Sequence, residues 1–439
     1  MNYLVTLQAE CKKQMMKLRI MGCLLMAAIA VGAWAQGGTK SPYSQFGMGL
    51  LSDYSQSMSR GMNGVGFALR QGSQVNTLNP ASYAGVDSLT MLFDMGLSGQ
   101  MTNFKEGSVS RNASMASFEY VVASFRAWKG VGVSFGVLPF TSVGYDYVNT
   151  TTSDATGTLK ESYSGSGGLH QLFLGVGAQV AGPLSVGANI GYLWGSIDRS
   201  VSPSASSASN TLTKKYSTSV SNFKLDVGAQ WEQKLGKNDK LTVGAVVGIG
   251  HQLKNDAEMT ITNLKSASSK TDTTTFTVKD AMALPMSYGI GAAYNHGGRL
   301  TVAADFQLDK WGGVDLPGYV GGTYQKLNGQ LKDRTKVAAG VDFIPNPMGR
   351  KYFDHVHYRA GVGYATPYYN IDGKEGPKEL SASLGFALPI VNAYNNRSVL
   401  NISGQWVRSS ASGLITENTF RLNIGITFNE RWFMKWKVD

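Results

Sequence analysis

Histidines are the residues of this sequence with the widest choice of chemistry, since imidazole can act as a general base or a metal ligand near neutral pH. His355 and His357 are two positions apart, so in a strand both side chains lie on one face, with Asp354 beside them. No third or fourth ligand lies near them in the sequence, and a solvated strand end is the favoured interpretation. The other histidines are isolated from one another: His170, His251 and His296.

No motif indicates an enzyme. Two glycine-rich stretches, Gly61–Gly66 and Gly165–Gly168, lack the strand-to-helix context that phosphate loops need. A hydrolytic Ser/His or Asp/His constellation cannot be placed across strands from one sequence. Nucleic-acid binding has no support, because no basic cluster with interleaved aromatic residues occurs. We therefore expect no catalytic residues, no cofactor and no bound metal.

The first 35 residues have the pattern of a secretory signal peptide. Four basic residues precede an apolar run at 22–31, and Ala33 and Ala35 form a small-residue cleavage site. The apolar run is about half of the roughly 20 residues that a spanning helix needs, so a membrane anchor is a minor alternative. Most of the apolar run follows Cys23, whereas the apolar run of a lipoprotein signal precedes the lipidated cysteine. Both cysteines lie in this segment, so the exported chain is expected to lack thiols.

The formal net charge is +11, and removal of residues 1–35 takes away four basic side chains and one acidic side chain, which leaves +8. Only 16% of the residues are charged and 53 are glycine, whereas ordinary domains have about 25% charged residues. This composition favours a β-rich wall in contact with lipid. No composition shift divides the chain after residue 90, so one large domain is expected.

From residue 88 onward, apolar and polar residues alternate with a period of two, which indicates β-strands. In 420–428, for example, Phe420, Leu422 and Ile424 share one face, and Arg421 and Asn423 share the other. The runs have about ten residues or more, the length of a tilted strand that crosses a bilayer. A large soluble β-sandwich would bury the same apolar face and is the alternative fold. No stretch after the signal is apolar for the ~18 residues of a spanning helix.

The predicted fold is all-β, a transmembrane antiparallel β-barrel of about 14 strands over residues 88–428. Predicted strands include 130–150, 240–262 and 275–295. The links between strands are alternately short and long, and 101–111 is one of the long links. Outer-membrane barrels have short periplasmic turns and long outer loops, so both chain ends should be periplasmic. Residues 429–439 are a periplasmic tail or the end of the last strand.

Residues 36–87 do not follow the strand pattern. The stretch 47–86 is rich in glycine and ends with Asn79, Pro80 and Ala81. A ring of about 14 strands is wider than the ~8-stranded size that wall side chains can fill. We therefore predict that this segment enters the barrel from the periplasm as a plug.

Two prolines fall well inside predicted strands, Pro139 in the third and Pro285 in the eighth. Proline removes a backbone donor, so each position predicts a bulge or an interrupted pairing. An interruption at Pro139 and Phe140 could open the barrel wall. A bulge that only adds curvature is an equally good interpretation of the residue alone.

Asn79-Pro80-Ala81, just before the first strand, resembles the Asn-Pro-Ala motif in the N-terminal hatch of FadL-type outer-membrane transporters of hydrophobic compounds. The resemblance implies a 14-stranded barrel with a hatch, and a kink in the third strand that opens the wall laterally. Pro139, within Val137–Phe140, lies where that kink belongs, and the hatch motif is expected to face it. Later segments around Leu284-Pro285, Tyr358–Gly361 and Trp432-Phe433 resemble the Bacteroidetes branch. The chain ends at Asp439, whereas many barrels end on an aromatic residue, so Phe428 or Trp432 could be the assembly signal.

The resemblance implies passive uptake of a small hydrophobic molecule, fatty-acid-like or aromatic, across the outer membrane of a Gram-negative bacterium. Asn79, Pro80 and Ala81 would belong to the gate, and Pro139 and Phe140 to the lateral opening. Expected partners are outer-membrane lipid, lipopolysaccharide and the hydrophobic ligand. The alternative is a FadL-like barrel that serves the type IX secretion apparatus as a docking or carrier subunit. A porin for polar solutes ranks third, because a plug obstructs bulk flow.

Overall fold

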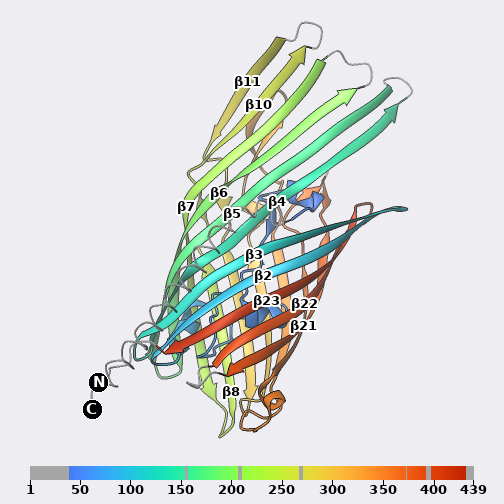
Figure 1. Ribbon diagram of the computed structural model, residues 1–439. Coiled ribbons are helices and arrows are strands. Elements are labelled where there is room, and N and C mark those ends of the chain that lie inside the picture. The colour runs from blue at the N-terminus through green and yellow to red at the C-terminus, as the bar shows by residue number, and fades with distance from the viewer. Residues whose placement is uncertain are drawn as a thin grey trace, which may run out of the picture.

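The computed structural model describes residues 39–153, 157–205, 210–265, 270–371, 373–391 and 397–431. Its main feature is a wall of tilted strands around a chain segment in the interior (Figure 1). The predicted signal peptide and its two cysteines lie outside the described residues, as does the chain after Arg431. No helix among the described residues is long and apolar enough to span a membrane.

The wall is a closed antiparallel barrel of 14 strands, which confirms the predicted fold class. The ring closes where the first wall strand pairs with the last, from Thr90↔Arg431 to Lys105↔Thr416. In order around the ring the strands are β2 (Thr90–Glu106), β3 (Val109–Trp128), β4 (Val131–Ser153), β5 (Gly157–Ala181), β6 (Leu184–Ala205), β7 (Asn210–Lys234), β8 (Asp239–Gly248), β13 (Ser287–His296), β14 (Leu300–Asp309), β17 (Arg334–Phe343), β18 (His357–Ala365), β21 (Lys378–Val391), β22 (Arg397–Ser410) and β23 (Thr416–Arg431).

Shorter elements connect or line the wall. They are η1 (Pro42–Gln45), β1 (Leu50–Leu51), α2 (Ser57–Gly61), η2 (Pro80–Gly85), β9 (His251–Gln252), β10 (Asp256–Lys265), β11 (Lys270–Lys279), β12 (Ala283–Leu284), η3 (Trp311–Gly313), β15 (Leu316–Val320), β16 (Thr323–Leu327), η4 (Tyr352–His355), β19 (Asn370–Ile371) and β20 (Lys374–Glu375). The first four of these lie in the chain before the wall, and the others lie in the links between wall strands.

The period of two places apolar side chains on the outside of the ring. In β23, Leu422 and Ile424 are 43% and 46% exposed, while the alternating Asn423 and Thr427 are buried. The outer face is therefore an apolar band suited to lipid, and the inner face carries the polar residues. An inverted pattern of this kind excludes the soluble β-sandwich, which would bury the apolar face.

Several links that were predicted to be long loops are continuations of strands. Residues 101–111 form the ends of β2 and β3, with a turn at Gly107-Ser108 between them. These residues are polar and lack alternation, but backbone hydrogen bonds do not depend on side-chain polarity, so the pairing continues beyond the apolar band. The strands β4 to β7 continue furthest and form, with β10 and β11, a sheet that rises above the rest of the barrel (Figure 1). We call this end of the molecule the upper end.

The predicted strands 240–262 and 275–295 are each broken in the middle. The first consists of β8 and β10 and the second of β11 and β13, with the short pair β9–β12 between them. Pro285 lies in the second break, between β12 and β13. The expectation that proline interrupts a strand here is met, because Pro285 cannot donate a backbone hydrogen bond to the ladder.

Candidate functional site: the lumen and a gap in its wall

Residues 39–86, here called the luminal segment, lie inside the ring (Figure 1). Wall glycines make room for its backbone. A Cβ added at Gly132, Gly244 or Gly361 would lie within 2.4 Å of backbone atoms of this segment. Many of its residues are buried, among them Met48, Met62 and Tyr83. The segment is therefore packed against the inner face by close backbone approach.

Asn79, Pro80 and Ala81 form the start of η2, and all three are buried. Asn79 is the N-cap: its Oδ1 accepts from the Ala81 N–H at 3.0 Å, and Pro80 occupies the first helical position, where no N–H is needed. The Asn79 amide also donates to the carbonyl oxygen of Ala229 in β7, at 3.1 Å. One side chain thus caps the helix and ties it to the wall.

The expectation that this motif faces Pro139 is wrong. The Pro80 carbonyl lies against Gly177 and Gly187, and Gly177 pairs with Gly132, whereas Pro139 pairs with His170 further up the same strands. The glycine positions decide the placement, because η2 can approach the wall backbone only where no Cβ intervenes.

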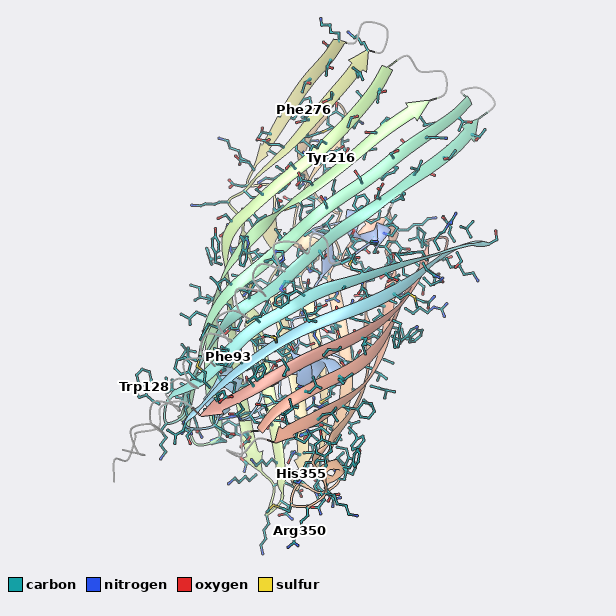
Figure 2. All side chains as sticks on the ribbon, viewed as in Figure 1. Phe93, Trp128, Tyr216, Phe276, Arg350 and His355 are labelled. Carbon is teal, nitrogen blue, oxygen red and sulfur yellow. The ribbon has the colours of Figure 1, made fainter. Side chains whose placement is uncertain are left out.

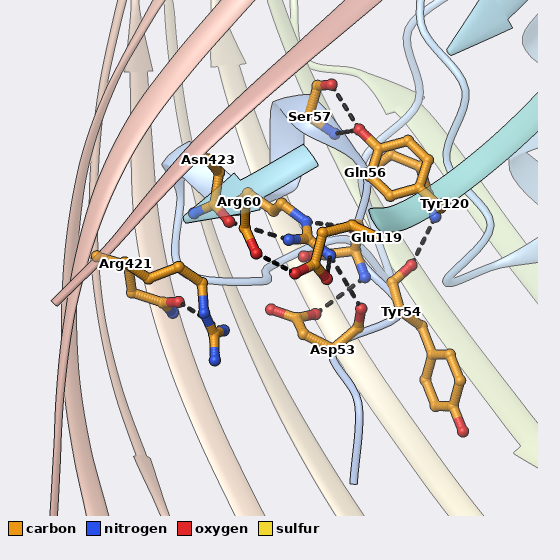
Figure 3. Close-up of polar contacts among 12 residues, drawn as sticks. Asp53, Tyr54, Gln56, Ser57, Arg60, Glu119, Tyr120, Arg421 and Asn423 are labelled. Atoms are coloured by element: carbon orange, nitrogen blue, oxygen red, sulfur yellow. Dashed lines mark hydrogen bonds and ion pairs between the residues drawn. The ribbon is translucent and has the colours of Figure 1, made fainter. Parts of the chain in front are cut away.

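A buried ion pair ties the middle of the luminal segment to the wall (Figure 3). Arg60, 5% exposed, contacts Glu119 of β3 at 2.9 Å and donates to the Asn423 Oδ1 of β23 at 3.0 Å. Its Nε donates to the carbonyl of Ser55 within the segment. A buried charge is costly without partners. These wall residues therefore fix where the Arg60 side chain lies in the lumen.

A second polar contact lies beside the first. The backbone N–H of Ser57 donates to the Tyr120 hydroxyl at 2.7 Å, and the Ser57 hydroxyl donates to the Asp94 carboxylate at 2.9 Å. Asp94 and Tyr120 are buried wall residues of β2 and β3. The α2 helix is thus held at its first residue as well as at Arg60.

Asp53 contributes a charge to the same region (Figure 3). Burial by itself raises the pKa of its carboxyl, but the positive charges of Lys336 and Arg60 and hydrogen bonds from Ser55 outweigh burial, so the pKa is held below its usual value. Burial lowers the pKa of the Arg60 guanidinium, and the charges of Glu119 and Asp53 outweigh that effect and raise it. Both groups therefore stay charged at neutral pH.

The wall is open between β3 and β4. The two strands have 20 and 23 residues, but they pair only from Val121↔Val137 to Trp128↔Val131. Just above the last pair, β4 has a bulge, since Pro139 pairs with His170 and Thr141 with Leu169, which leaves Phe140 without a partner residue in β5. Figure 1 shows β3 and β4 diverging above this point. The predicted interruption is therefore present at Pro139 and Phe140.

A piece of the luminal segment takes the place of β3 along the free edge of β4. Strand β1 pairs antiparallel with β4, Leu50 with Ser142 and Leu51 with Thr141, and the Ser52 N–H donates to the Phe140 carbonyl at 3.0 Å. The edge of β4 that β3 leaves is thus paired with the interior chain for a few residues.

A cavity of about 1370 Å³ lies in the lumen beside the gap. Its lining includes residues on both sides of the gap, such as Ser117 and Ser142, and reaches the luminal segment at Leu50 and Asp53. The lining mixes apolar side chains with charged ones, among them Asp226, Asp309, Arg334, Lys336 and Glu379. The cavity could hold an apolar molecule that also carries polar groups.

Above the cavity, a large apolar cluster fills the upper end of the lumen. It joins Tyr43 and Met48 of the luminal segment to Phe140 at the bulge and to Trp311 and Tyr368 from the links at that end. The Tyr368 hydroxyl accepts from the Met48 N–H at 3.0 Å. The cluster members Phe140, Trp311 and Tyr368 also line the cavity, so the cavity extends up to this cluster.

A family model described as BamG matches residues 15–439. The chain belongs to the BamG family. No curated protein sequence matches this BamG family member.

Solved structures with the same fold include FadL-type transporters. The toluene transporter TodX of Pseudomonas putida has 15% identity and a TM-score of 0.60, over 88% of this chain and 100% of its own. The toluene transporter TbuX of Ralstonia pickettii has 14% identity and a TM-score of 0.59, over 87% and 99%. A Pseudomonas aeruginosa FadL homologue has 13% identity and a TM-score of 0.59, over 86% and 99%. The predicted FadL-type architecture is therefore confirmed as a fold.

The histidines of this BamG family chain are dispersed. His357 contacts the Asp342 carboxylate at 3.0 Å, whereas His355 contacts the Gly349 carbonyl at 2.9 Å, so each already has a separate partner. Figure 2 shows His355 near the lower end, beside Arg350. Within the described part of the chain, no group of three His, Cys, Asp or Glu residues could hold a metal ion. Gly165–Gly168 lies within β5 and forms no phosphate loop.

Sequence reasoning missed the charged residues that fix the luminal segment. Asp53, Arg60, Asp94 and Glu119 have no motif, and they are distant in sequence from many of their partners. One signal was available: Asp94 lies between outward-facing Phe93 and Met95 in the first strand, so its carboxylate had to point into the lumen. A carboxylate that points into a plugged barrel needs a hydrogen-bond donor, and the plug is the segment that can supply one.

Proposed function

We propose that this BamG family protein is an outer-membrane channel for the passive uptake of small hydrophobic molecules. The fold supports a barrel in the outer membrane, with the short turns and both termini in the periplasm. Structures of the same fold are described as toluene transporters and as a monoaromatic hydrocarbon channel. At 13–16% identity these likenesses speak for the fold, so the argument for uptake depends on the geometry of this chain.

The observation that carries the proposal is that residues from both sides of the β3–β4 gap line the cavity, Pro139 and Phe140 among them. An apolar molecule gains free energy when it moves from water into hydrocarbon, about 25 cal/mol per Å² of apolar surface. A side opening lets it leave the cavity into the bilayer without a return to water. The apolar outer residues beside the gap, such as Phe135 and Leu172, place the exit against acyl chains.

In this proposal the luminal segment is the hatch. Its lower part, with Asn79, Pro80 and Ala81, is anchored to the wall and closes the periplasmic side. Its upper part includes β1, which is held to β4 by a few backbone hydrogen bonds at the edge of the gap. Gating then requires movement of β1 and its neighbours, and no covalent chemistry.

The test is a reversible strap across the gap. Ser117 and Ser142 border the cavity from β3 and β4, and Ser117→Cys with Ser142→Cys can be joined by a bifunctional thiol reagent that contains a disulfide. Uptake of radiolabelled toluene, decane and decanol into proteoliposomes should fall in the strapped protein and recover after reduction. Unchanged uptake of all three probes in the strapped protein would contradict a lateral exit here.

A matched pair of cysteines controls for the reagent. Ser164 and Ser200 face each other across β5 and β6, where pairing is continuous, so a strap between Ser164→Cys and Ser200→Cys should leave uptake unchanged. The role as a docking or carrier subunit in type IX secretion stays a prediction. Its measurement is the recovery of secretion subunits or cargo with the purified barrel.

A further inference from the structure

The wall has a second break, separated from the first by the four strands β4, β5, β6 and β7. Strand β7 pairs with β8 from Asp226 to Lys234, and with β10 from Asn210 to Thr218. Between these two stretches, residues 219–225 of β7 have no strand partner on that side. At the lower limit of the break, the Ile249 N–H donates to the Leu225 carbonyl at 2.9 Å.

The break arises because a whole hairpin bends into the lumen. The hairpin keeps one register throughout, with Gly248 opposite Ser287 below the bend, His251 opposite Leu284 within it, and Asp256 opposite Lys279 above it. The bend buries Leu253, Met282 and Leu284 in the apolar cluster at the upper end of the lumen. Both strands of the hairpin therefore lie inside the wall at the bend, and neither pairs with β7 there.

Both breaks lie on one row of paired residues across the wall. Across β4, β5, β6 and β7, the residues Pro139, His170, Trp194 and Ser221 are successive partners. The first break begins at Pro139, and Ser221 lies in the middle of the second. On the outer face, Tyr192 and Phe223 are partners and are 51% exposed each, so this level is the upper edge of the apolar band. Aromatic residues of this kind mark the membrane interface.

Two stacked rings cover the second break. Phe223 of β7 and His251 of the bend have ring centroids 4.2 Å apart and planes inclined by 8°. The His251 ring is weakly held otherwise: its Nδ1 lies 3.4 Å from the Ile249 carbonyl, and its buried Nε2 has no hydrogen-bond partner among the described residues. The cover is thus made of side chains, whereas β5, β6 and β7 beside it are joined by backbone hydrogen bonds.

The cavity lies behind this cover. Its lining includes Lys224 and Asp226 of β7 and Gly248, Ile249 and Pro285 of the bent hairpin, that is, residues on both sides of the break. Lys224 and Asp226 form an ion pair, and the Lys224 ammonium lies 5.8 Å from the ring centre of Tyr54 in the luminal segment.

We propose that this break is a second side passage, which admits the acyl chain of a lipid or a chain-like apolar molecule to the cavity when the Phe223–His251 stack opens. This proposal extends the proposed function, because one cavity would then have two lateral passages. One lies at each edge of the sheet formed by β4 to β7. Opening needs rotation of two side chains and breaks no strand pairing. The stack stabilises the closed state, since offset aromatic pairs are favourable beyond their buried area.

The experiment uses dodecanol that carries a diazirine, dissolved in the membrane of proteoliposomes and activated by light. It measures which residues of the protein become labelled. In Phe223→Ala with His251→Ala, labelling of Lys224, Ile249 and Leu284 should rise about fivefold, which corresponds to the loss of an aromatic pair worth about 1 kcal/mol. The variant His251→Phe preserves a stack and should label as the unchanged protein does. Tyr192→Ala, which removes an equally exposed ring at the same level over a continuous β5–β6 seam, should also leave labelling unchanged.

The strap across the β3–β4 gap distinguishes entry through the second passage from entry through the first. If labelling behind the stack persists in the strapped double variant, the second passage is independent of the first. If it stays at the level of the unchanged protein, or disappears whenever the gap is strapped, the second passage is refuted. Failure of the proposed function has a different signature: Leu50 and Phe140, at the first gap, would remain unlabelled in every variant. The milder variants Phe223→Leu and His251→Gln allow the same comparison if the alanine pair fails to assemble.

Discussion

At the scale of single residues, the lumen is organised by a few buried charges. Arg60 has Glu119 and Asn423 as partners on two neighbouring regions of the wall, and Asp53 and Lys336 add charges of both signs nearby. Replacement of one partner leaves the other charge buried without compensation, which is why such pairs resist single substitutions. These residues set the position of the luminal segment beside the cavity.

Arg60→Met should loosen the luminal segment strongly. It keeps an unbranched apolar stem but leaves Glu119 uncompensated, and loss of one partner of a buried pair costs about 3–5 kcal/mol. The free energy of local opening, from hydrogen exchange of residues 53–64, measures the effect. Lys265→Met is the control, because the Lys265–Asp272 pair is exposed and such pairs contribute about 0–1 kcal/mol. Equal protection in both variants would show that the Arg60 contacts do not hold the segment.

The same residues predict a pH dependence. The pKa of the Asp53 carboxyl is held below its usual value, so the charged form stabilises the packed segment at every pH above the usual carboxyl pKa of about 3.9. Stability is lost as the pH falls below that value toward the lowered pKa. Hydrogen exchange of residues 53–64, corrected for intrinsic rates, should therefore become faster as the pH falls below about 4. Asp53→Asn should abolish this acid-dependent step, and a step that persists in this variant belongs to another group.

At the scale of elements, glycines in the wall decide where η2 can lie. The Asn79-Pro80-Ala81 turn rests on Gly177, Gly187 and Gly228, where an added Cβ would approach within 2.4 Å of its atoms. The motif and the wall are thus complementary: the Asn79 amide group donates to the Ala229 carbonyl, and the Pro80 backbone lies where neighbouring wall residues lack a Cβ. We infer that this part of the segment is the fixed end and that β1 is the mobile end.

Gly187→Ala tests that contact. Its Cβ would lie 2.4 Å from the Pro80 carbonyl carbon, and overpacking of this kind costs about 1–3 kcal/mol. Hydrogen exchange of residues 81–83 should accelerate accordingly. Gly404→Ala in β22 is matched in chemistry but has its nearest neighbour at 3.6 Å, so it should change nothing. If the two variants behave alike, η2 does not depend on close contact with β6.

At the scale of the whole molecule, the barrel is asymmetric. The strands β4 to β7, with β10 and β11, rise above the others, and strand pairing is interrupted at both edges of the β4–β7 sheet (Figure 1). An apolar cluster fills the upper end of the lumen, and residues beside both interruptions line the cavity. This shape suits exchange between the lumen and the bilayer, which is the reason for the uptake proposed above.

Much of the architecture followed from the amino-acid sequence alone. Alternation with a period of two is a local property, and it sufficed to predict an all-β wall of about 14 strands with its apolar face outward. Pro139 and Pro285 each lie where the strand pairing is interrupted, and proline has no N–H to donate to the ladder. The Asn79-Pro80-Ala81 turn was likewise recognisable as part of an interior segment.

Tertiary structure decided the rest. Which residues meet across the lumen depends on register and on contacts over hundreds of residues, such as that of Arg60 with Asn423. Proline predicts an interruption but leaves open whether it becomes a bulge, a gap or an inward bend, and here neighbouring strands produced a gap at Pro139 and a bend at Pro285. The polar strand extensions were predicted to be loops, because local polarity does not reveal pairing with a neighbouring strand. The sequence therefore determined the elements and their faces, and only the packing of distant elements decided the cavity and its openings.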